Sequence, residues 1–454
     1  MIARLVRALD DRVGSAHFVS KALRKAFPDH WSFMLGEINA YAFLILVVTG
    51  TFLALFFRPS DHPTVYRGAY TPFDGVSMSQ AYASTLHLSF DVNLGLLVRQ
   101  IHHWTALVFL AAIVAHMARV FFTGAFRKPR DINWVIGVLL FMTTMLAGFT
   151  GYSLPDDMLS GTGLRIADSV LLSIPLAGTW ASYLLIDGPY PSHALIPRMF
   201  VMHVYLLPAT IAALIGLHVA LVWRQKHTQF PGPGRSERNV VGSPLVPQYA
   251  AKSMALLAAV AAVVTLLGTF VQINPIWLFG PYTGWNVVNP AQPDWYVGWL
   301  EGALRMGPAF ALHLGSHVIP SPFWPAVALP AVIFAGLALW PWLERMVTRD
   351  DRSHHLLDLP RDVPMRTGIG AAFLVFALGL TLAGSSDVQA RYIHLPITGI
   401  TIFYRWFCVA GPLAAFSIAY AFCSELRKRG GVQEAPRARL RRSPSGGFEE
   451  ERIP

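Results

Sequence analysis

Apolar residues run along this chain in eight long stretches separated by polar and charged segments. Each stretch has roughly the 20 residues that an apolar helix needs to cross the hydrocarbon core of a bilayer. The predicted membrane helices cover residues 33–57, 99–122, 133–155, 199–223, 250–272, 322–343, 366–384 and 402–424. The pattern therefore predicts an all-α fold, a polytopic membrane protein with about eight transmembrane helices.

Lysine and arginine are distributed unevenly between the connecting segments. An even number of crossings places both termini on one side, and that side collects 28 Lys and Arg residues against 8 on the other. The side richer in Lys and Arg is the cytoplasmic one. We therefore expect both termini in the cytoplasm, and the net charge of +10 requires no nucleic-acid partner.

The two ends of the chain and its two cysteines complete this outline. Residues 1–32 carry charges throughout and lack the continuous apolar core of a signal peptide, which favours an amphipathic segment on the cytoplasmic surface. Residues 427–454 are charged and rich in Gly and Pro, which predicts a disordered tail. Cys408 and Cys423 form no CxxC or CxxCH pattern, so we interpret them as small apolar side chains.

Four histidines lie in the second and fourth apolar stretches, where an imidazole needs a partner: His102, His116, His203 and His218. At about 100° and 1.5 Å per residue, the 14-residue interval in the second stretch keeps both rings on one face, about 21 Å apart. The 15-residue interval in the fourth leaves an offset of about 60°, which a loosened turn beside Pro208 would absorb. His103 points away from this face, and we interpret it as a polar residue near the interface.

The second and fourth stretches run in the same direction, so their histidines lie at two matching depths. A tetrahedral metal would need further N, S or O ligands at each level, whereas a flat macrocycle with two axial positions needs only the two imidazoles. The spacing therefore predicts two stacked haems in a four-helix bundle over residues 33–225. Residues 226–426 would form a second membrane domain.

Glycines and arginines around the histidines support this arrangement. Gly36 and Gly50 on the first stretch, and Gly137 and Gly151 on the third, repeat the 14-residue interval. Such glycines would leave notches for porphyrin edges, although close helix packing is an alternative role. Three arginines near the membrane ends would pair with haem propionates, unless they only extend to the interface: Arg99, Arg119 and Arg198.

Together these features resemble cytochrome b of the cytochrome bc complexes, and most of all its actinobacterial form. The resemblance covers nearly the whole chain. Besides the histidines, glycines and arginines, it includes GYSLPDDMLSGTG after the third stretch and QPDWYVGW between the fifth and sixth. HTQFPGPGR and LPRDVPMRTG resemble the actinobacterial branch more narrowly.

The resemblance implies a subunit of a quinol:cytochrome c oxidoreductase in the bacterial plasma membrane. Quinol, here menaquinol, would be oxidised on the outer side, with electrons passing to a Rieske iron-sulfur protein and through two b-type haems to an inner quinone site, coupled to proton translocation. His102 and His203 would hold the low-potential haem, and His116 and His218 the high-potential haem. Further implied partners are a diheme cytochrome c, a terminal cytochrome c oxidase and a second copy of the chain.

For the outer quinol site, the family motif Pro-Glu-Trp-Tyr corresponds to Pro293, Asp294, Trp295 and Tyr296. A carboxylate near a quinol hydroxyl is a natural proton acceptor, so Asp294 is the candidate, although its side chain is shorter than Glu. Glu301 could share the proton transfer, while Trp295 and Tyr296 would line the pocket and Tyr296 could donate a hydrogen bond. An interfacial aromatic belt with a helix cap is the alternative.

The inner quinone site is less distinct in the sequence. Many relatives have a Lys-Asp pair at the start of the fifth helix, where this chain has Lys252 and Ser253, so the acidic group is missing there. The candidate lining residues are Glu37, Trp223, His227 and Lys252. We expect His354 and His355, in a connection on the same side, to be solvated.

Two other classes of function remain open from the sequence alone. Buried histidines also relay protons in transporters and channels, although that role does not explain an interval shared by four helices. A diheme membrane subunit of a quinone-linked dehydrogenase would reuse paired histidines, but without the PDWY segment or the last three membrane helices.

Overall fold

The structure is a computed structural model that describes residues 10, 12, 14, 23–286, 292–315 and 317–429, and the backbone of 438–442 and 448–452. Eight helical segments in this part of the chain are long and apolar enough to cross a membrane, which confirms the predicted all-α polytopic fold. They are η1 (Trp31–Met34) with α3 (Leu35–Ala54), α5 (Gly95–Phe122), α6 (Asp131–Ser153), α9 (Leu195–Val201) with η3 (Met202–Leu206) and α10 (Leu207–Gln225), η4 (Leu245–Tyr249) with α11 (Ala250–Phe270), η5 (Trp324–Ala328) with α14 (Leu329–Thr348), α15 (Pro364–Gly384) and α17 (Ile397–Arg429).

Short elements join these spans. The helices among them are α4 (Gln80–Phe90), α7 (Met158–Leu172), α8 (Gly178–Ile186), α12 (Ile276–Phe279), α13 (Trp295–Met306), α16 (Ser386–Ile393), η2 (Thr71–Phe73) and η6 (Pro360–Asp362). The antiparallel strand pairs are β1 (Ala26–Phe27) with β4 (Ser243–Pro244), β2 (Pro63–Val65) with β3 (Ser77–Ser79), and β5 (Leu312–Leu314) with β6 (His317–Ile319).

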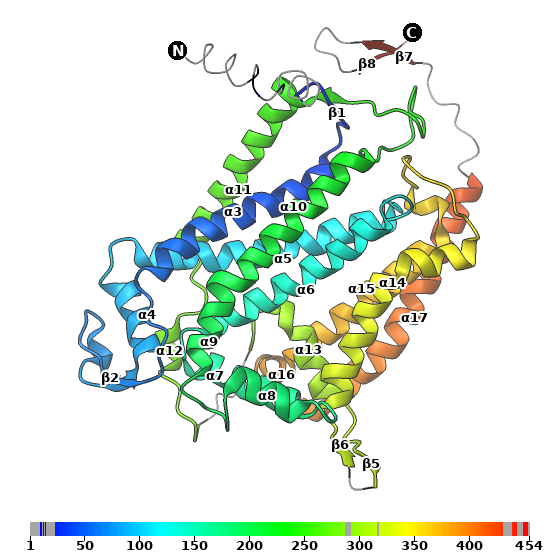
Figure 1. The fold of residues 1–454 in the computed structure, drawn as a ribbon. Coiled ribbons are helices and arrows are strands. Elements are labelled where there is room, and N and C mark those ends of the chain that lie inside the picture. Colours follow the sequence, from blue (N-terminus) through cyan, green and yellow to red (C-terminus); the bar gives the residue numbers. More distant parts are fainter. Residues whose placement is uncertain are drawn as a thin grey trace.

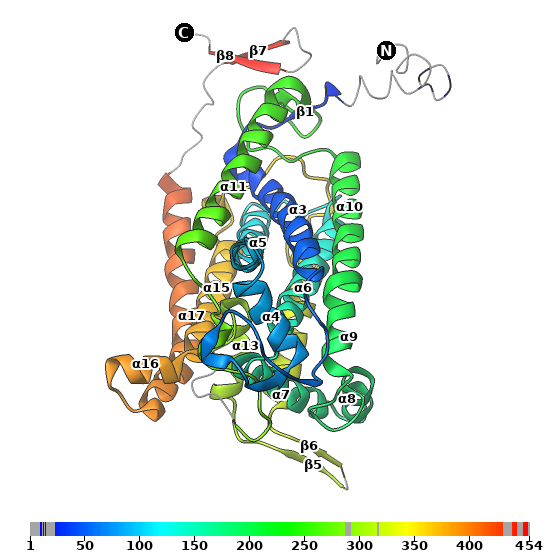
Figure 2. The ribbon, with the colours of Figure 1, turned by 90° about the vertical axis from the view of Figure 1, so that its left-hand side faces the viewer.

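The connections gather at two ends of the bundle (Figures 1 and 2). Helices α4, α7, α8, α12, α13 and α16 lie at one end, which we call the loop end. β1 and the last turns of α17 lie at the opposite end, which we call the terminal end. The first and last membrane helices thus begin and end on the same side, as an even number of crossings requires.

The first four spans form two helix pairs. α3 packs on α5, and α10 packs on α6. Midway along both pairs, Ala42, Phe109, Ile113 and Ile211 form an apolar cluster. The helices α3, α5 and α10 each contribute a residue to this cluster. The cluster therefore forms an apolar layer that separates an upper from a lower level of the bundle.

The fourth span contains the loosened turn that the sequence predicts beside Pro208. η3 is a π-helical turn in which the Leu207 amide donates to the Met202 carbonyl, five residues back. Proline lacks the amide that a regular helix would use, and a π turn accommodates one additional residue. The 15 residues between His203 and His218 therefore behave almost like 14, and both rings face the same way.

Some boundaries and terminal segments differ from the sequence predictions. The first span ends as a helix at Ala54, although its apolar run continues to residue 57. In the tail, where we expected disorder, β7 (Ala438–Arg442) and β8 (Phe448–Arg452) form an antiparallel pair. The amphipathic segment over residues 1–32 lies largely outside the described residues and stays a prediction.

Candidate functional site

The four predicted histidines form two facing pairs between the helix pairs. The ring centroids of His102 and His203 are 6.3 Å apart with an interplanar angle of 76°. Those of His116 and His218 are 6.4 Å apart at 72°. The two pairs thus repeat one geometry at two levels of the membrane bundle.

This separation suits a metal held between two imidazoles. Ring centroids 6.3 Å apart leave the two imidazoles close enough for both to bind one metal ion through bonds of about 2 Å. His102 Nδ1 lies 2.9 Å from Thr49 Oγ1, and His203 Nδ1 lies 2.9 Å from the Ala147 carbonyl. These contacts orient each ring and leave its Nε2 for a ligand bond. The residues present therefore fit a haem at this level.

The glycines of the flanking helices make room for the imidazoles. A Cβ at Gly151 would lie 2.3 Å from His203 Cε1, and one at Gly50 would lie 3.1 Å from His102 Cε1. A Cβ at Gly36 would lie 3.4 Å from His116 Cε1, whereas one at Gly137 would meet no described atom within 4 Å. Three of the four glycines thus accommodate the imidazole rings, and the contact of the glycines with porphyrin edges stays a prediction. The fourth faces open space.

Two of the three predicted arginines have a buried donor atom that makes no hydrogen bond. Arg99 is 8% exposed, and its Nη2 donates to the Asn274 carbonyl at 2.9 Å. Arg99 Nη1 and Arg119 Nε are buried with no hydrogen-bond partner among the described residues. Buried donors of this kind need an acceptor, which an anionic group between the helices would provide.

Arg198 differs from the other two. Its side chain pairs with Asp187 at 3.2 Å and donates to the Leu184 carbonyl at 2.8 Å. It is absent from the lining of the cavity that contains His102 and His203. The spacing five residues before His203 placed it near this level, but the carboxylate and the free carbonyl at the end of α8 attract it elsewhere.

A cavity toward the loop end joins the first histidine pair to the predicted quinol residues. Its lining includes His102, His203, Arg99, Asp294 and Tyr296. Tyr296 is 3% exposed, and its ring reaches Gly148 of α6, where a Cβ would lie 2.5 Å from its hydroxyl. Residues from both halves of the chain therefore share one enclosure.

Asp294 has an acid–base partner that sequence reasoning missed. His103 Nε2 lies 3.0 Å from each Asp294 carboxylate oxygen, and the Tyr296 hydroxyl donates to Asp294 at 3.3 Å. Asp294 occupies the N-cap position of α13 yet makes no capping hydrogen bond, so the cap alternative is wrong. The helical angle showed that His103 turns away from His102, but no local pattern could show that it turns toward Asp294.

Tyr296 and Glu301 differ in protonation and in hydrogen bonding. Burial raises the pKa of Tyr296 well above its ordinary value, and the Asp294 carboxylate adds to this, so its hydroxyl stays a donor. Glu301 Oε1 pairs with Arg305 at 2.5 Å, while its Oε2 is buried without a hydrogen-bond partner among the described residues. Burial raises the pKa of Glu301, although the hydrogen bond with Arg305 opposes this.

Trp295, expected to line the pocket, contributes less than Tyr296. Its side chain is 42% exposed and is absent from the cavity lining, as are Pro293 and Glu301. Successive residues of a helix point about 100° apart. Because Tyr296 turns inward on α13, Trp295 before it turns outward.

At the terminal end, Glu37 is the half-buried carboxylate among the inner-site candidates. The hydroxyls of Tyr249 and Ser253 both donate to Glu37, and Lys252 pairs with Asp29 at 2.7 Å. The acidic groups missing from the sequence motif therefore come from elsewhere in the chain.

The aromatic side of this region is built around Phe27. Its ring centroid lies 4.5 Å from that of His227 and 4.7 Å from that of Tyr249, and Trp223 packs at 6.2 Å. Burial lowers the pKa of His227 to about 4, and nearby Lys25 and Arg130 act in the same direction. His227 is therefore neutral and able to accept a hydrogen bond.

The expectation that His354 and His355 are solvated is wrong. The His354 side chain is 13% exposed and pairs with Asp350 at 3.2 Å. Its carbonyl accepts from Arg130, whose Nη2 also lies 2.8 Å from His355 Nδ1. These histidines join the connections of the terminal end to one another.

Eight membrane helices that hold two stacked imidazole pairs define a class, the membrane-bound electron-transfer proteins. The family described as "Cytochrome b(N-terminal)/b6/petB" matches residues 107–281. The cytochrome bc1 complex cytochrome b subunit of Mycobacterium leprae is 49% identical over 94% of this chain and 78% of its own length. That of Streptomyces coelicolor is 47% identical over 92% and 77%.

The chain belongs to the family of cytochrome b subunits of cytochrome bc1 complexes. A solved structure titled "Hyperthermophilic respiratory Complex III" shares the fold, with a TM-score of 0.69 over 93% of this chain and 99% of that one, at 20% identity. The family is one of haem proteins, and membership in it disfavours both the transporter and the dehydrogenase-subunit interpretations.

Proposed function

We propose that this chain oxidises menaquinol at the loop end and reduces a quinone at the terminal end, with electron transfer across the membrane coupled to proton translocation. One observation carries the proposal: two histidine pairs with the same geometry lie at two levels of one bundle. Their ring centroids are 6.3 and 6.4 Å apart. His102 and His203 would hold the low-potential haem and His116 and His218 the high-potential haem. When bound, these groups supply one-electron carriers at two depths.

The protein's own residues would handle the protons at the loop end. Asp294 would accept a proton from the quinol hydroxyl, because its carboxylate lines the same cavity as the first histidine pair and is not used as a helix cap. His103, 3.0 Å away, would receive that proton or stabilise the neutral acid. Tyr296, held protonated by burial, would donate a hydrogen bond to the substrate or to Asp294, and Glu301 would offer its unpaired oxygen as a further acceptor.

At the terminal end, protons would move toward the quinone. Glu37 is bonded to two hydroxyls that can pass a proton on, and neutral His227 beside Phe27 would donate a hydrogen bond from its ring N–H to a quinone carbonyl. Lys252, paired with Asp29 at 2.7 Å, would add a positive charge on this side. Glu37 directly follows Gly36, whose added Cβ would lie 3.4 Å from the His116 ring.

The family supports the partners that we propose. A Rieske iron-sulfur protein would take one electron from each quinol, and a diheme cytochrome c and a terminal cytochrome c oxidase would act further on, with a second copy of the chain completing a homodimer. The loop end would face outward across a bacterial plasma membrane, since the terminal end has most Lys and Arg. A green fluorescent protein fused after residue 429 should fluoresce, and a dark fusion with an active alkaline phosphatase at that position would reverse the sidedness.

Visible spectra and turnover of the purified complex test the function. We expect two b-type haems per chain, reduced by menaquinol in a manner that depends on the Rieske protein. A preparation without haem would favour the transporter, and haem reduction by menaquinol without any Rieske protein, followed by no cytochrome c reduction, would favour a dehydrogenase subunit.

A further inference from the structure

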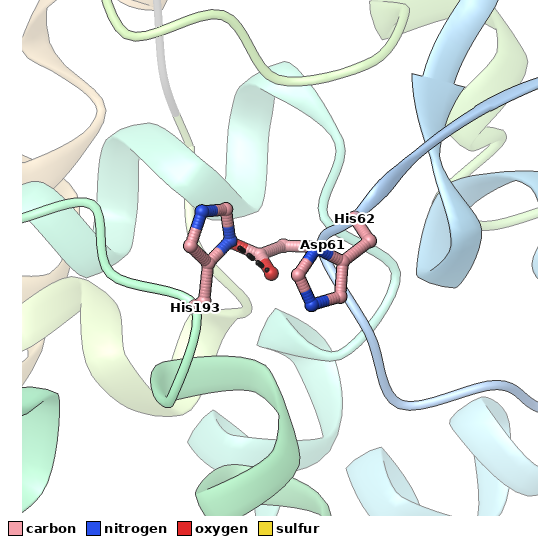
Figure 3. Close-up of side chains that lie close together, drawn as sticks. All are labelled: Asp61, His62 and His193. Atoms are coloured by element: carbon pink, nitrogen blue, oxygen red, sulfur yellow. Dashed lines mark hydrogen bonds and ion pairs between the residues drawn. The ribbon is translucent and has the colours of Figure 1, made fainter.

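Away from the cavity, three potential metal ligands meet at the loop end. Asp61 and His62 lie between α3 and β2, and His193 lies directly before α9. Their ligand atoms are all within 4.8 Å of one another. Figure 3 shows the two histidine rings on either side of the Asp61 carboxylate.

The three side chains of this cluster are already in close contact, and a hydrogen bond joins His193 to Asp61. His193 Nδ1 lies 2.8 and 2.9 Å from the two Asp61 oxygens. The His62 and His193 rings are stacked, with centroids 4.8 Å apart and planes at 16°. A bridging cation in place of the proton would leave nitrogen and oxygen about 3.3 Å apart at bond lengths of about 2 Å, so the pair has to open by only about half an ångström.

The backbone holds two of the three ligands in place. The Gln80 amide donates to the His62 carbonyl at 3.0 Å, and the Ala81 amide donates to the Ser60 carbonyl at 2.8 Å. Asp61 is thus fixed on both sides against the start of α4, and its side chain is 18% exposed. Folding has therefore already restricted the conformations of these ligands, so metal binding has less conformational entropy to remove.

His193 supplies the mobile side of the site. Its side chain is 72% exposed, and His62 is also exposed, so both rings can rotate to close the gap. The segment of His193 is nonetheless anchored, because the Leu195 amide donates to the Ser192 carbonyl at 3.2 Å. The exposed rings also give a cation a direct path from solvent.

We propose that Asp61, His62 and His193 form a binding site for a borderline divalent cation of the Zn²⁺ class. Two imidazoles and one carboxylate suit Zn²⁺, Cu²⁺ or Ni²⁺, whereas Mg²⁺ and Ca²⁺ prefer oxygen ligands alone. Three protein ligands leave a fourth position for water, which is typical of an exchangeable rather than a closed structural site. The cation would link the segment after α3 to the segment before α9, the two helices that flank the first histidine pair.

The site does not depend on the proposed electron transfer, so its test needs no turnover. Zn²⁺ is titrated calorimetrically into the purified complex, and Cu²⁺ is added for electron paramagnetic resonance. In the parent we expect a site whose Cu²⁺ spectrum shows imidazole nitrogen couplings. Zn²⁺ binding should appear as a saturable heat in this titration.

Variants at the exposed ligands separate this site from others in the complex. His193→Ala and His62→Ala should each weaken Zn²⁺ binding by roughly tenfold or more, and Asp61→Asn should do the same. His87→Ala is the matched control, since His87 forms a similar pair with Asp91 at 2.5 Å but belongs to no three-ligand group in the described residues. It should leave this binding unchanged.

The outcomes that would overturn the proposal are equally direct. Parental Zn²⁺ affinity and stoichiometry in His193→Ala, or a Cu²⁺ spectrum without imidazole coupling, would exclude the site. An equal loss in His87→Ala would show unspecific surface binding. Because His193 is mostly exposed, His193→Ala should fold, and an unchanged haem spectrum of the purified variant checks this.

Discussion

Asp294 stands at the N-cap of α13 but does not cap the helix. Aspartate at an N-cap ordinarily accepts hydrogen bonds from the first turn of its helix. Here the carboxylate instead faces His103 and Tyr296 inside the cavity. An uncapped helix start and a half-buried pair of titratable side chains both cost stability, and a quinol-oxidising site would explain why the chain keeps them.

Asp294→Asn should slow quinol oxidation while both haems remain bound. An amide cannot accept the proton, and loss of such a group ordinarily reduces the rate by about 10²–10⁴-fold. Because His103 remains beside the position, we expect a reduction near the lower limit. Steady-state menaquinol oxidation measures it, with haem content as the control, and unchanged turnover would remove Asp294 from the mechanism.

Asp156, in the connection between α6 and α7, should make stability depend on pH. Burial raises its pKa from 3.8 to about 7, and the charges of Asp61 and Asp157 add to this, while a hydrogen bond with Ser79 opposes it. The unfolded chain loses this proton near pH 4 but the folded chain keeps it to about pH 7. The free energy of unfolding therefore falls as pH rises through this window.

Asp156→Asn should remove that dependence. Asn also tolerates the positive φ of 56° at this position, so the change should not strain the backbone. Thermal unfolding of the complex between pH 5 and 8 provides the measurement. The variant should be the more stable of the two, with a gap that widens up to about pH 7, and a gap independent of pH would contradict the assignment.

The helices and their orientation could be predicted from the sequence where apolar length and helical periodicity determine them. Apolar length located all eight spans, and the helical angle placed the four histidines on facing sides. The extra residue between His203 and His218 predicted a loosened turn, which the structure has as η3. Each of these features depends on residues close together in the chain.

Gly151→Ala tests how closely the helices hold the rings. The added Cβ would lie 2.3 Å from His203 Cε1, and the hydrogen bond with Ala147 on the same helix keeps the ring from moving away. We expect overpacking of about 1–3 kcal/mol and loss or distortion of the haem signal at the loop end.

Gly336→Ala on α14 is the control, because no described atom lies within 4 Å of its added Cβ. Its spectrum should match that of the parent. A normal spectrum in Gly151→Ala would show that the bundle yields at this point and that the glycine is not needed there.

Across the whole molecule, the features that sequence reasoning missed join distant segments. His103 meets Asp294 across 191 residues, and Asp29 meets Lys252 across 223. Arg198 has the expected position in the chain but turns to Asp187. The Asp61, His62 and His193 cluster likewise requires two connections to be brought together by the fold. No local spacing specifies such contacts.

The arrangement of the whole molecule gives the two histidine levels different surroundings. The loop-end level opens to the cavity with Asp294 and Tyr296, while the terminal-end level lies near Glu37 and its hydroxyl partners. The apolar layer around Phe109 and Ile211 separates them. The quinol-oxidising and quinone-reducing sites that we propose on opposite sides of the membrane would need this separation.

A potentiometric titration of the b-haem absorbance in purified complex, parent against His116→Leu, tests the central claim most directly. The parent should show two one-electron transitions per chain. His116→Leu should retain one of them, since His102 and His203 are intact at the other level. Two transitions in the variant, or a single one in the parent, would contradict the pairing of the histidines.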